Sequence, residues 1–197
     1  MKTKILLILM VFAGSKLVNS QDINKVKNLQ SVVWFGLDFS NTKLVGTSYD
    51  FADLTKIKNH FFVEWNHLIL RESEKYDIGR AYKIASVENK IEIAIKRSML
   101  VDTNTLISIV PVEITRDELP NFLKDYNIET KSEIGLVYIV ESLDKANLTV
   151  TAWETFFNIK TGEILYAKKS KGRVGGFGFR NYWIRGVYNI LYKPTNY

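Results

Sequence analysis

The sequence lacks cysteine altogether, and it contains only three prolines and two histidines among 197 residues. The absence of cysteine excludes disulfide bonds, thiol catalysis and metal sites built on cysteine. No Gly-, Ser- or Pro-rich run interrupts the middle of the chain, which indicates that no linker divides it. We therefore expect one continuous folded unit.

The first twenty residues predict a secretory signal peptide. Lys2 and Lys4 precede an apolar run from Ile5 to Ala13, which is too short to span a bilayer as a helix. Val18, Asn19 and Ser20 are small or modest in size and place the cleavage before Gln21. A signal that stays attached as an anchor is the alternative. Because lipidation of a bacterial exported protein needs a cysteine, we expect no stable membrane anchor and a periplasmic or secreted location.

The charge balance gives no support for a nucleic-acid partner. The chain carries 27 Lys and Arg against 21 Asp and Glu, and loss of Lys2, Lys4 and Lys16 with the signal lowers its net charge from +6 to +3. The densest basic cluster consists of Lys168, Lys169, Lys171 and Arg173. We interpret this cluster as the solvated face of an edge strand, whose charges discourage aggregation. A patch for polyanions or a membrane surface is the alternative.

Cleavage leaves about 177 residues, which is enough for one domain with a substantial core. We predict a lead-in at residues 21–30, a single α/β (α+β) domain at 31–193 and a tail at 194–197. Helices between strands at this spacing favour a mixed β-sheet with a late β-hairpin, packed against two to three helices.

Several strands are expected from hydrophobic patterns. Ser31 to Phe39 is apolar on both faces, which predicts a central strand covered on both sides. Lys90 to Arg97 alternates strictly and predicts a half-buried strand, and Tyr82 to Ile84 predicts a brief one. Further strands are expected at 105–112, 135–141, 148–159 and 163–171, and Gly162 closes the hairpin between the last two.

Three helices are expected. The longest runs from Asp53 to about Lys75, capped by an aspartate and marked by apolar residues at three- and four-residue spacing. A shorter one begins at Thr115, where Glu118 completes a capping box. The last is expected to be capped by Asn181 and stopped by Pro194.

This order of elements, with the segment NIKTGEIL at 158–165 between the last two strands, resembles a group of bacterial envelope domains. The group includes the curli secretion protein CsgG, the penicillin-binding-protein activator LpoB and the TolB amino-terminal domain. Thr161, Gly162 and Glu163 match the turn of that group, whereas Asn158 replaces its usual aspartate. The resemblance implies the fold and an envelope location. CsgG-like pore formation would need membrane-inserting hairpins and usually a lipid anchor, and the sequence shows neither.

No catalytic or metal constellation is predicted. His60 and His67 lie seven residues apart on the long helix, about 10 Å along its axis, which is too far for one metal ion to bind both. We expect Glu64 instead to contact Arg71 or His67. No G-x-S-x-G elbow is present to hold a nucleophilic serine. A carboxylate pair assembled in space stays open.

The glycine-rich run from Gly172 to Gly178 admits two readings. It lacks the G-K-[ST] of a phosphate-binding loop, so we interpret it as a tight strand-to-helix crossing where glycines let backbones approach closely. Aromatic residues and an arginine follow it, a composition that protein interfaces favour. The candidate interface consists of Gly175, Gly176, Phe179, Arg180, Asn181 and Trp183.

The sequence therefore favours a non-enzymatic exported binding or accessory domain of the bacterial cell envelope. We expect it to act through contacts with an envelope protein and to need no cofactor. The alternative is a small-ligand-binding protein or a hydrolase whose site is assembled in space.

Overall fold

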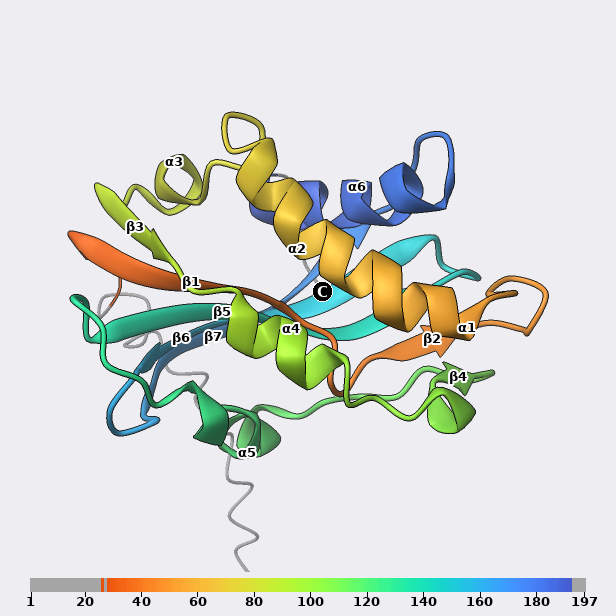
Figure 1. Ribbon diagram of the computed structural model, residues 1–197, viewed down its shortest axis with the longest axis horizontal. Coiled ribbons are helices and arrows are strands. Elements are labelled where there is room, and N and C mark those ends of the chain that lie inside the picture. Colours follow the sequence, from red (N-terminus) through yellow and green to blue (C-terminus); the bar gives the residue numbers. More distant parts are fainter. Residues whose placement is uncertain (1–25, 27, 193–197) are drawn as a thin grey trace, which may run out of the picture.

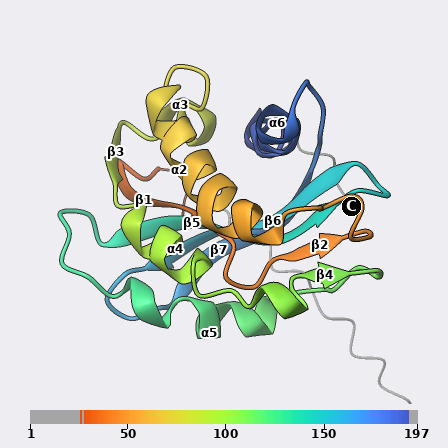
Figure 2. The ribbon, with the colours of Figure 1, turned by 45° about the vertical axis from the view of Figure 1, so that its right-hand side comes forward.

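The computed structural model describes residue 26 and residues 28–192, so the expected signal peptide, its cleavage site and Pro194 lie outside the described residues. The described chain forms one seven-stranded mixed sheet with helices packed on it (Figures 1 and 2). The predicted α/β class and single compact domain are confirmed.

Strand β5 (Ile134–Asp144) is the centre of the sheet. Strands β1 (Ser31–Asp38) and β2 (Lys43–Val45) follow one another along one side of it, both parallel to it. Strand β3 (Ser86–Asn89) adds to β1 and β4 (Ile107–Ser108) adds to β2, again in parallel. On the other side, β6 (Thr149–Asn158) and β7 (Ile164–Arg173) form the predicted antiparallel hairpin.

The predicted long helix is present but is not regular throughout. It begins with α1 (Leu54–Lys56), continues through a π-helical turn, η2 (Ile57–Phe61), and ends with α2 (Phe62–Arg71). The Asp53 side chain caps it by accepting a hydrogen bond from the backbone of Lys56 at 2.8 Å.

Apart from α5, which is given below, five further helical elements are short. They are α3 (Ile78–Tyr82), α4 (Glu92–Ser98), η3 (Thr103–Thr105), η4 (Arg116–Glu118) and η5 (Lys124–Tyr126). The capping box predicted from Thr115 and Glu118 is present at η4, directly before α5 (Leu119–Phe122). The last helix is α6 (Phe179–Tyr192).

The core has two parts, one on each face of the sheet. Helices α2 and α6 cover one face, and α5 with its flanking turns covers the other (Figure 2). Trp34 and Tyr138 face the first layer, whereas Phe35 and Phe157 face the second. Seven of the eight residues of β1 are buried, which confirms its prediction as a strand covered on both sides.

Two strand predictions are wrong. Most of the segment predicted as a strand at 90–97 belongs to helix α4 (Glu92–Ser98), because the buried residues Ile91, Ala94 and Ser98 recur at a helical spacing. The expected strand at Tyr82 to Ile84 is the end of α3, and Lys83 follows it with a left-handed φ of 58°. The strand of this region is β3, four residues later.

The start of the last helix also differs from its prediction. Helix α6 begins at Phe179, so Asn181 lies inside its first turn and is not its cap. Gly178, with φ of 79°, makes the bend before it. Gly162 has the predicted left-handed conformation in the β6–β7 turn, with φ of 72°.

Helix α6 is held against the hairpin by two glycines. A Cβ atom on Gly172 of β7 would lie 1.9 Å from the carbonyl oxygen of Gly186 in α6. A Cβ atom on Gly186 would lie 2.5 Å from Val150 of β6. The predicted glycine crossing is therefore correct for Gly172, where two backbones meet without room for a side chain.

This close approach predicts different effects for two neighbouring glycines. Gly172→Ala should lower the free energy of unfolding by about 3 kcal/mol or more, because its methyl group has no space. Gly175→Ala is the matched control, since nothing lies within 4 Å of the added atom, and it should change stability by less than about 0.5 kcal/mol. Urea unfolding followed by tryptophan fluorescence measures both. Equal stability of the two variants would contradict the close approach of α6 to β7 at Gly172.

Candidate functional site

The candidate site lies where the parallel strands end, and it begins with an irregularity in β1. Gly36 has φ of 90°, and the pairing of β1 with β5 shifts register beside it. The buried amide of Asn66, from α2, accepts from Leu37 N at 2.7 Å and donates to Leu37 O at 2.9 Å. A Cβ atom on Gly36 would lie 2.2 Å from the Asn66 side-chain oxygen. The helix thus bonds the strand only because glycine leaves room.

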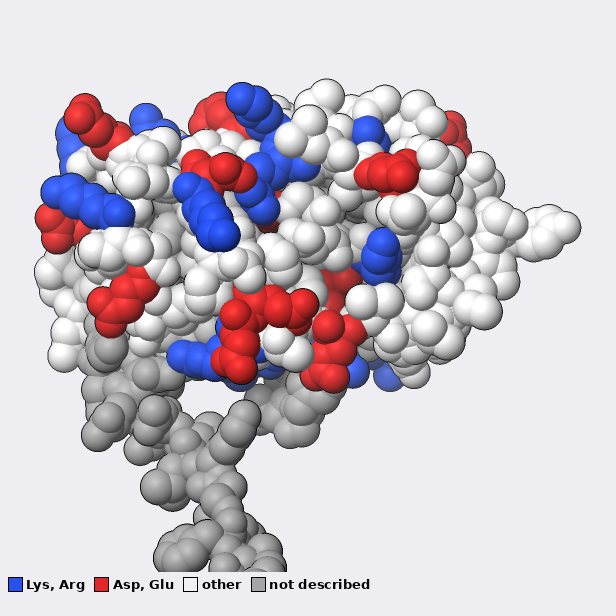
Figure 3. Space-filling model, turned by 90° about the horizontal axis from the view of Figure 1, so that it is seen from below, with Lys and Arg blue, Asp and Glu red and all other residues white. Residues whose placement is uncertain are grey.

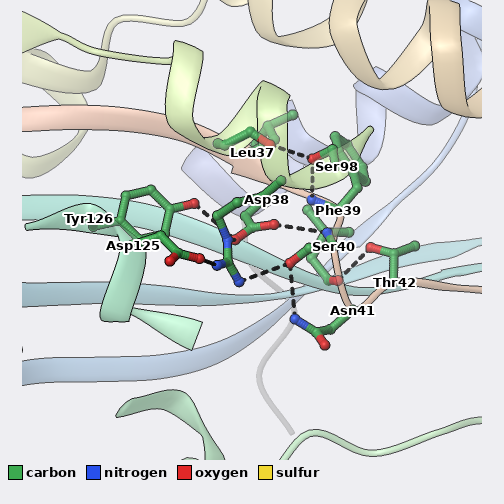
Figure 4. A network of polar contacts seen from close by, with 12 residues as sticks. Leu37, Asp38, Phe39, Ser40, Asn41, Thr42, Ser98, Asp125 and Tyr126 are labelled. Carbon is green, nitrogen blue, oxygen red and sulfur yellow. Dashed lines mark hydrogen bonds and ion pairs between the residues drawn. The ribbon is translucent and has the colours of Figure 1, made fainter. Parts of the chain in front are cut away.

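Asp38, the last residue of β1, is fully buried and bonds three other segments (Figure 4). Its Oδ1 accepts from Ser40 N at 2.8 Å, and its Oδ2 accepts from Arg97 Nε at 2.9 Å and from the Tyr126 hydroxyl at 2.8 Å. The Arg97 guanidinium also pairs with Asp125. Burial, together with the Asp38 carboxylate, raises the pKa of Tyr126 well above its usual range, so its hydroxyl stays a donor.

The chain between β1 and β2 is bonded by side chains as well. Phe39 N donates to Ser98 Oγ of α4 at 2.9 Å, and Thr42 N closes a turn onto Phe39 O at 3.0 Å. Thr42 Oγ1 donates to Val140 O of β5 at 2.5 Å. These bonds satisfy buried groups that the strand ladder does not reach, and they let β2 resume beside β5.

Beyond this break, four connecting segments lie in a row at one end of the sheet (Figure 1, right). We call this surface the loop row, and it comprises residues 46–50, 109–112, 145–148 and 174–178. Backbone hydrogen bonds of 2.9 Å each tie neighbouring members together: Gly46 N to Ser108 O, Lys145 N to Val45 O, and Val174 N to Leu148 O.

The loop row carries most of the exposed large hydrophobic side chains. Of the eight among the described residues, six belong to it: Tyr49 (95% exposed), Ile109 (83%), Val110 (59%), Val112 (40%), Leu148 (38%) and Phe177 (95%). The remaining two, Met99 and Leu100, directly follow α4. Viewed from below, this end of the molecule shows few charged residues, whereas charges of both signs crowd the rest (Figure 3, right).

Side-chain hydrogen bonds shape the loops of the row. The Asp50 carboxylate accepts from Thr47 N at 2.9 Å and from Thr47 Oγ1 at 2.7 Å, and these bonds lower the pKa of Asp50. Asp144 holds Asn147 in the same way, at 2.8 Å to its backbone nitrogen and 2.7 Å to its side chain. Leu148 follows with φ of 54°, a left-handed conformation that non-glycine residues rarely adopt. The apolar side chains are therefore presented on ordered turns.

A charged groove of about 210 Å³ adjoins the loop row at Val112. A register shift between Val140 and Ser142 puts Glu141 and Asp144 on the same face of β5, where both line this groove. Lys169 Nζ of β7 lies 2.7 Å from Glu141 and 3.1 Å from the exposed Glu113. Lys169 is therefore part of a buried ion pair and not only of a solvated edge, although β7 pairs only with β6 in the described sheet.

Four of the six residues predicted as an interface line one groove. Gly175, Gly176, Arg180 and Asn181 border a hollow of about 350 Å³ between the start of α6 and the end of α2. Exposed Phe177 of the loop row borders it too. The Arg180 guanidinium lies 3.5 Å from Glu64 of α2. The structure thus places this groove next to the loop row.

The other two predicted residues pack inward. Trp183 is 2% exposed, and its ring stacks on Phe51 with centroids 5.6 Å apart. Phe179 is half-buried against Phe61 and Trp65. The Trp65 indole donates to the backbone oxygen of Arg180 at 2.9 Å. These aromatic residues join α6 to the long helix.

On the long helix, Glu64 pairs with Arg71, one of its two expected partners. Arg71 lies 2.5 Å from Glu64, while His60 and His67 are exposed. Within the described part of the chain, no three His, Cys, Asp or Glu side chains gather in a way that could hold a metal ion.

The loop row and the Asp38 network were not predicted from the sequence. The apolar residues of SIVPV at 108–112 look like part of a strand, and exposure leaves no mark in a single sequence. The one available signal is an aspartate and an asparagine within apolar stretches, at Asp38 and Asn66, because buried polar groups need specific partners.

Because Asp38 is fully buried, we predict that the stability of the fold depends strongly on its charged partner, Arg97. Arg97→Met should lower the free energy of unfolding by about 3–5 kcal/mol, because it leaves a fully buried carboxylate without its counter-charge. The matched control is Arg71→Met. Arg71 is exposed and its half-buried partner Glu64 keeps Arg180 at 3.5 Å, so this pair should contribute less than about 1 kcal/mol. Chemical unfolding of both variants gives the comparison. Losses of equal size would show that Asp38 does not depend on Arg97.

Comparison of the chain with protein-family models, with curated proteins and with solved structures gives no match. Among the residues that the structure describes, no helix has the length and apolar character needed to cross a membrane. The function of the protein is accordingly inferred from its own residues.

Proposed function

We propose that this chain is an exported binding domain of the bacterial cell envelope and that it contacts a partner protein through the loop row. One observation carries the proposal: six exposed large hydrophobic side chains gather in four adjacent loops. Single exposed apolar residues are ordinary on soluble proteins, whereas groups of them mark interaction sites.

The composition of the loop row favours a protein as the partner. Tyr49 and Phe177 are its most exposed members, and aromatic side chains are enriched where proteins meet. The charged groove beside Val112 supplies the polar rim that surrounds the apolar centre of such interfaces. Because hydrogen bonds already order the loops at Asp50 and Asp144, binding would cost little conformational entropy.

Export and the envelope location are supported by the sequence alone. The basic start and short apolar run at residues 1–20 favour a signal peptide, and the turn at Thr161 to Glu163 carries the resemblance to envelope domains. That turn joins β6 and β7, at the end of the hairpin opposite to the loop row.

The alternative of a hydrolase is favoured by one observation, the three carboxylates that line the charged groove. Glu141 is paired with Lys169 and accepts from Ile114 N at 2.7 Å, and Asp144 is bonded to Asn147. Glu113 also pairs with Lys169, at 3.1 Å. All three carboxylates therefore serve structural contacts, and we prefer the binding function.

Site-specific photocrosslinking tests the proposal. A photoreactive phenylalanine derivative replaces Tyr49 in the full-length chain, and it is irradiated in the cells that normally produce the protein. We expect a discrete crosslinked partner. The second change Ile109→Asp should lower its yield at least about tenfold, as expected when an interface loses about 1.4 kcal/mol. Because Ile109 is 83% exposed, this change should alter folding stability by less than about 0.5 kcal/mol.

The control places the same probe at Lys131, an exposed residue in the loop before β5 at the opposite end of the sheet. No such partner should be captured there. Identical products from both positions, or a yield at position 49 that is insensitive to Ile109→Asp, would show that the loop row is not the binding surface.

A further inference from the structure

The hollow of about 350 Å³ between the start of α6 and the end of α2 is bordered by more positive than negative side chains. Lys75, Arg180 and Arg185 line it, against one carboxylate, that of Glu72. All four side chains are exposed. We call this hollow the basic groove. It is continuous with the loop row, because residues 175–177 belong to both.

Two arginines share one carboxylate beside the basic groove. The Glu64 side chain of α2 lies 2.5 Å from Arg71 and 3.5 Å from Arg180. One carboxylate offsets the charge of one guanidinium, so these three side chains together remain positive. The arginine side chains are 56% and 46% exposed, and a further carboxylate can therefore reach them.

Arg185 adds a second positive charge that the protein itself does not neutralise. Among the residues that the structure describes, no carboxylate forms an ion pair with it, and its guanidinium lies 4.8 Å from the centroid of the Tyr188 ring. Lys75, by contrast, pairs with Glu72 at 2.9 Å. In and beside the groove, four cations thus face two carboxylates, and such an excess attracts anions.

Phe177 stands where the basic groove meets the loop row. Its side chain is 95% exposed, and it lies between Gly176 and Gly178, whose φ angles of 111° and 79° require glycine. The backbone before it is tied down, because Gly175 N donates to Tyr182 O at 3.2 Å. An aromatic side chain beside exposed guanidinium groups suits a partner that combines apolar and acidic residues.

We propose that the partner of the loop row lays an acidic segment along the basic groove, with an apolar side chain against Phe177 and carboxylates on Arg180 and Arg185. This inference rests on the proposed function and adds the chemistry of the partner. Charge complementarity supports it, since carboxylates match guanidinium groups in charge and in hydrogen-bond geometry. Continuity supports it too, because a protein that covers the loop row reaches the groove in the same binding event.

Two peptides test this chemistry on the purified protein. The first has the sequence Asp-Glu-Phe-Asp-Glu with blocked ends, and the second replaces each acid by its amide, which keeps the size and removes the charge. The backbone signals of residues 175–177 and 185 in ¹H–¹⁵N NMR spectra follow the binding. We expect the acidic peptide to shift these signals and to bind about fivefold more tightly at low salt.

Arg185→Glu should reduce the affinity for the acidic peptide to that of the amide peptide, because it replaces an attractive charge by a repulsive one. Arg185→Lys keeps the charge and should retain most of the affinity. Equal affinities of the two peptides for the unmodified protein, or signals of residues 175–177 that do not move, would overturn the proposal.

Photocrosslinking from Tyr49 separates this inference from the proposed function. Arg185→Glu should lower the yield of the crosslinked partner about fivefold. Lys131→Glu changes the net charge equally at the opposite end of the sheet, where it should leave the yield unchanged. A partner captured equally with and without Arg185→Glu leaves the loop row as the binding surface but overturns the acidic segment. If no partner is captured, both proposals fail.

Vesicles address the other source of negative charge, a lipid surface. Phosphatidylcholine vesicles with and without phosphatidylglycerol are sedimented with the purified protein. We expect the protein to stay in the supernatant in both cases. Sedimentation that requires phosphatidylglycerol and is lost in Arg185→Glu would assign the basic groove to a membrane surface and overturn the acidic segment.

Discussion

On the side of β1 that faces β3, side chains rather than a neighbouring strand bond the second half of β1, while β5 pairs with it on the other side. The layout of the sheet beyond β1 depends on these side-chain hydrogen bonds. Strand β3 accompanies β1 only as far as Asn89, opposite Trp34. Past that point, Asn66 of α2 bonds Leu37, and Ser98 of α4 bonds Phe39. Because buried backbone groups must find partners, docking of the two helices and completion of the strand are one event.

The side-chain hydrogen bonds at the end of β1 also position the loop row. The carboxylate of Asp38 ends β1 inside the protein and bonds the turn at Ser40, after which β2 resumes beside β5. Strand β4 then pairs with β2, so the loops that follow β2, β4 and β5 reach the same end of the sheet. Loops on a rigid scaffold are where binding sites usually lie, because the scaffold has already paid the cost of ordering them. The apolar side chains at this end are explained best as part of such a site.

The sequence predicted those elements whose burial leaves a local pattern. For this reason the strand at 31–39, which is apolar on both faces, and the hairpin at 148–171 are predicted correctly. The segment 90–97 is not, because its isoleucines alternate as they would in a strand. Tertiary packing instead buries Ile91, Ala94 and Ser98, which recur at a helical spacing. The pair of Asp38 and Arg97 joins residues 59 positions apart, and such contacts have no local signature. Exposure of Ile109 is likewise a property of the folded surface.

The absence of cysteine makes a direct test of the loop row possible, because any introduced thiol is unique. Single-cysteine variants at Ile109 and, as a control, at Lys131 are labelled with a membrane-permeant maleimide in intact cells and after purification. The account predicts that the thiol at position 109 reacts readily in the purified protein and is protected in cells, whereas the thiol at position 131 reacts in both. Equal reactivity of position 109 in the two conditions would contradict the claim that a partner covers the loop row.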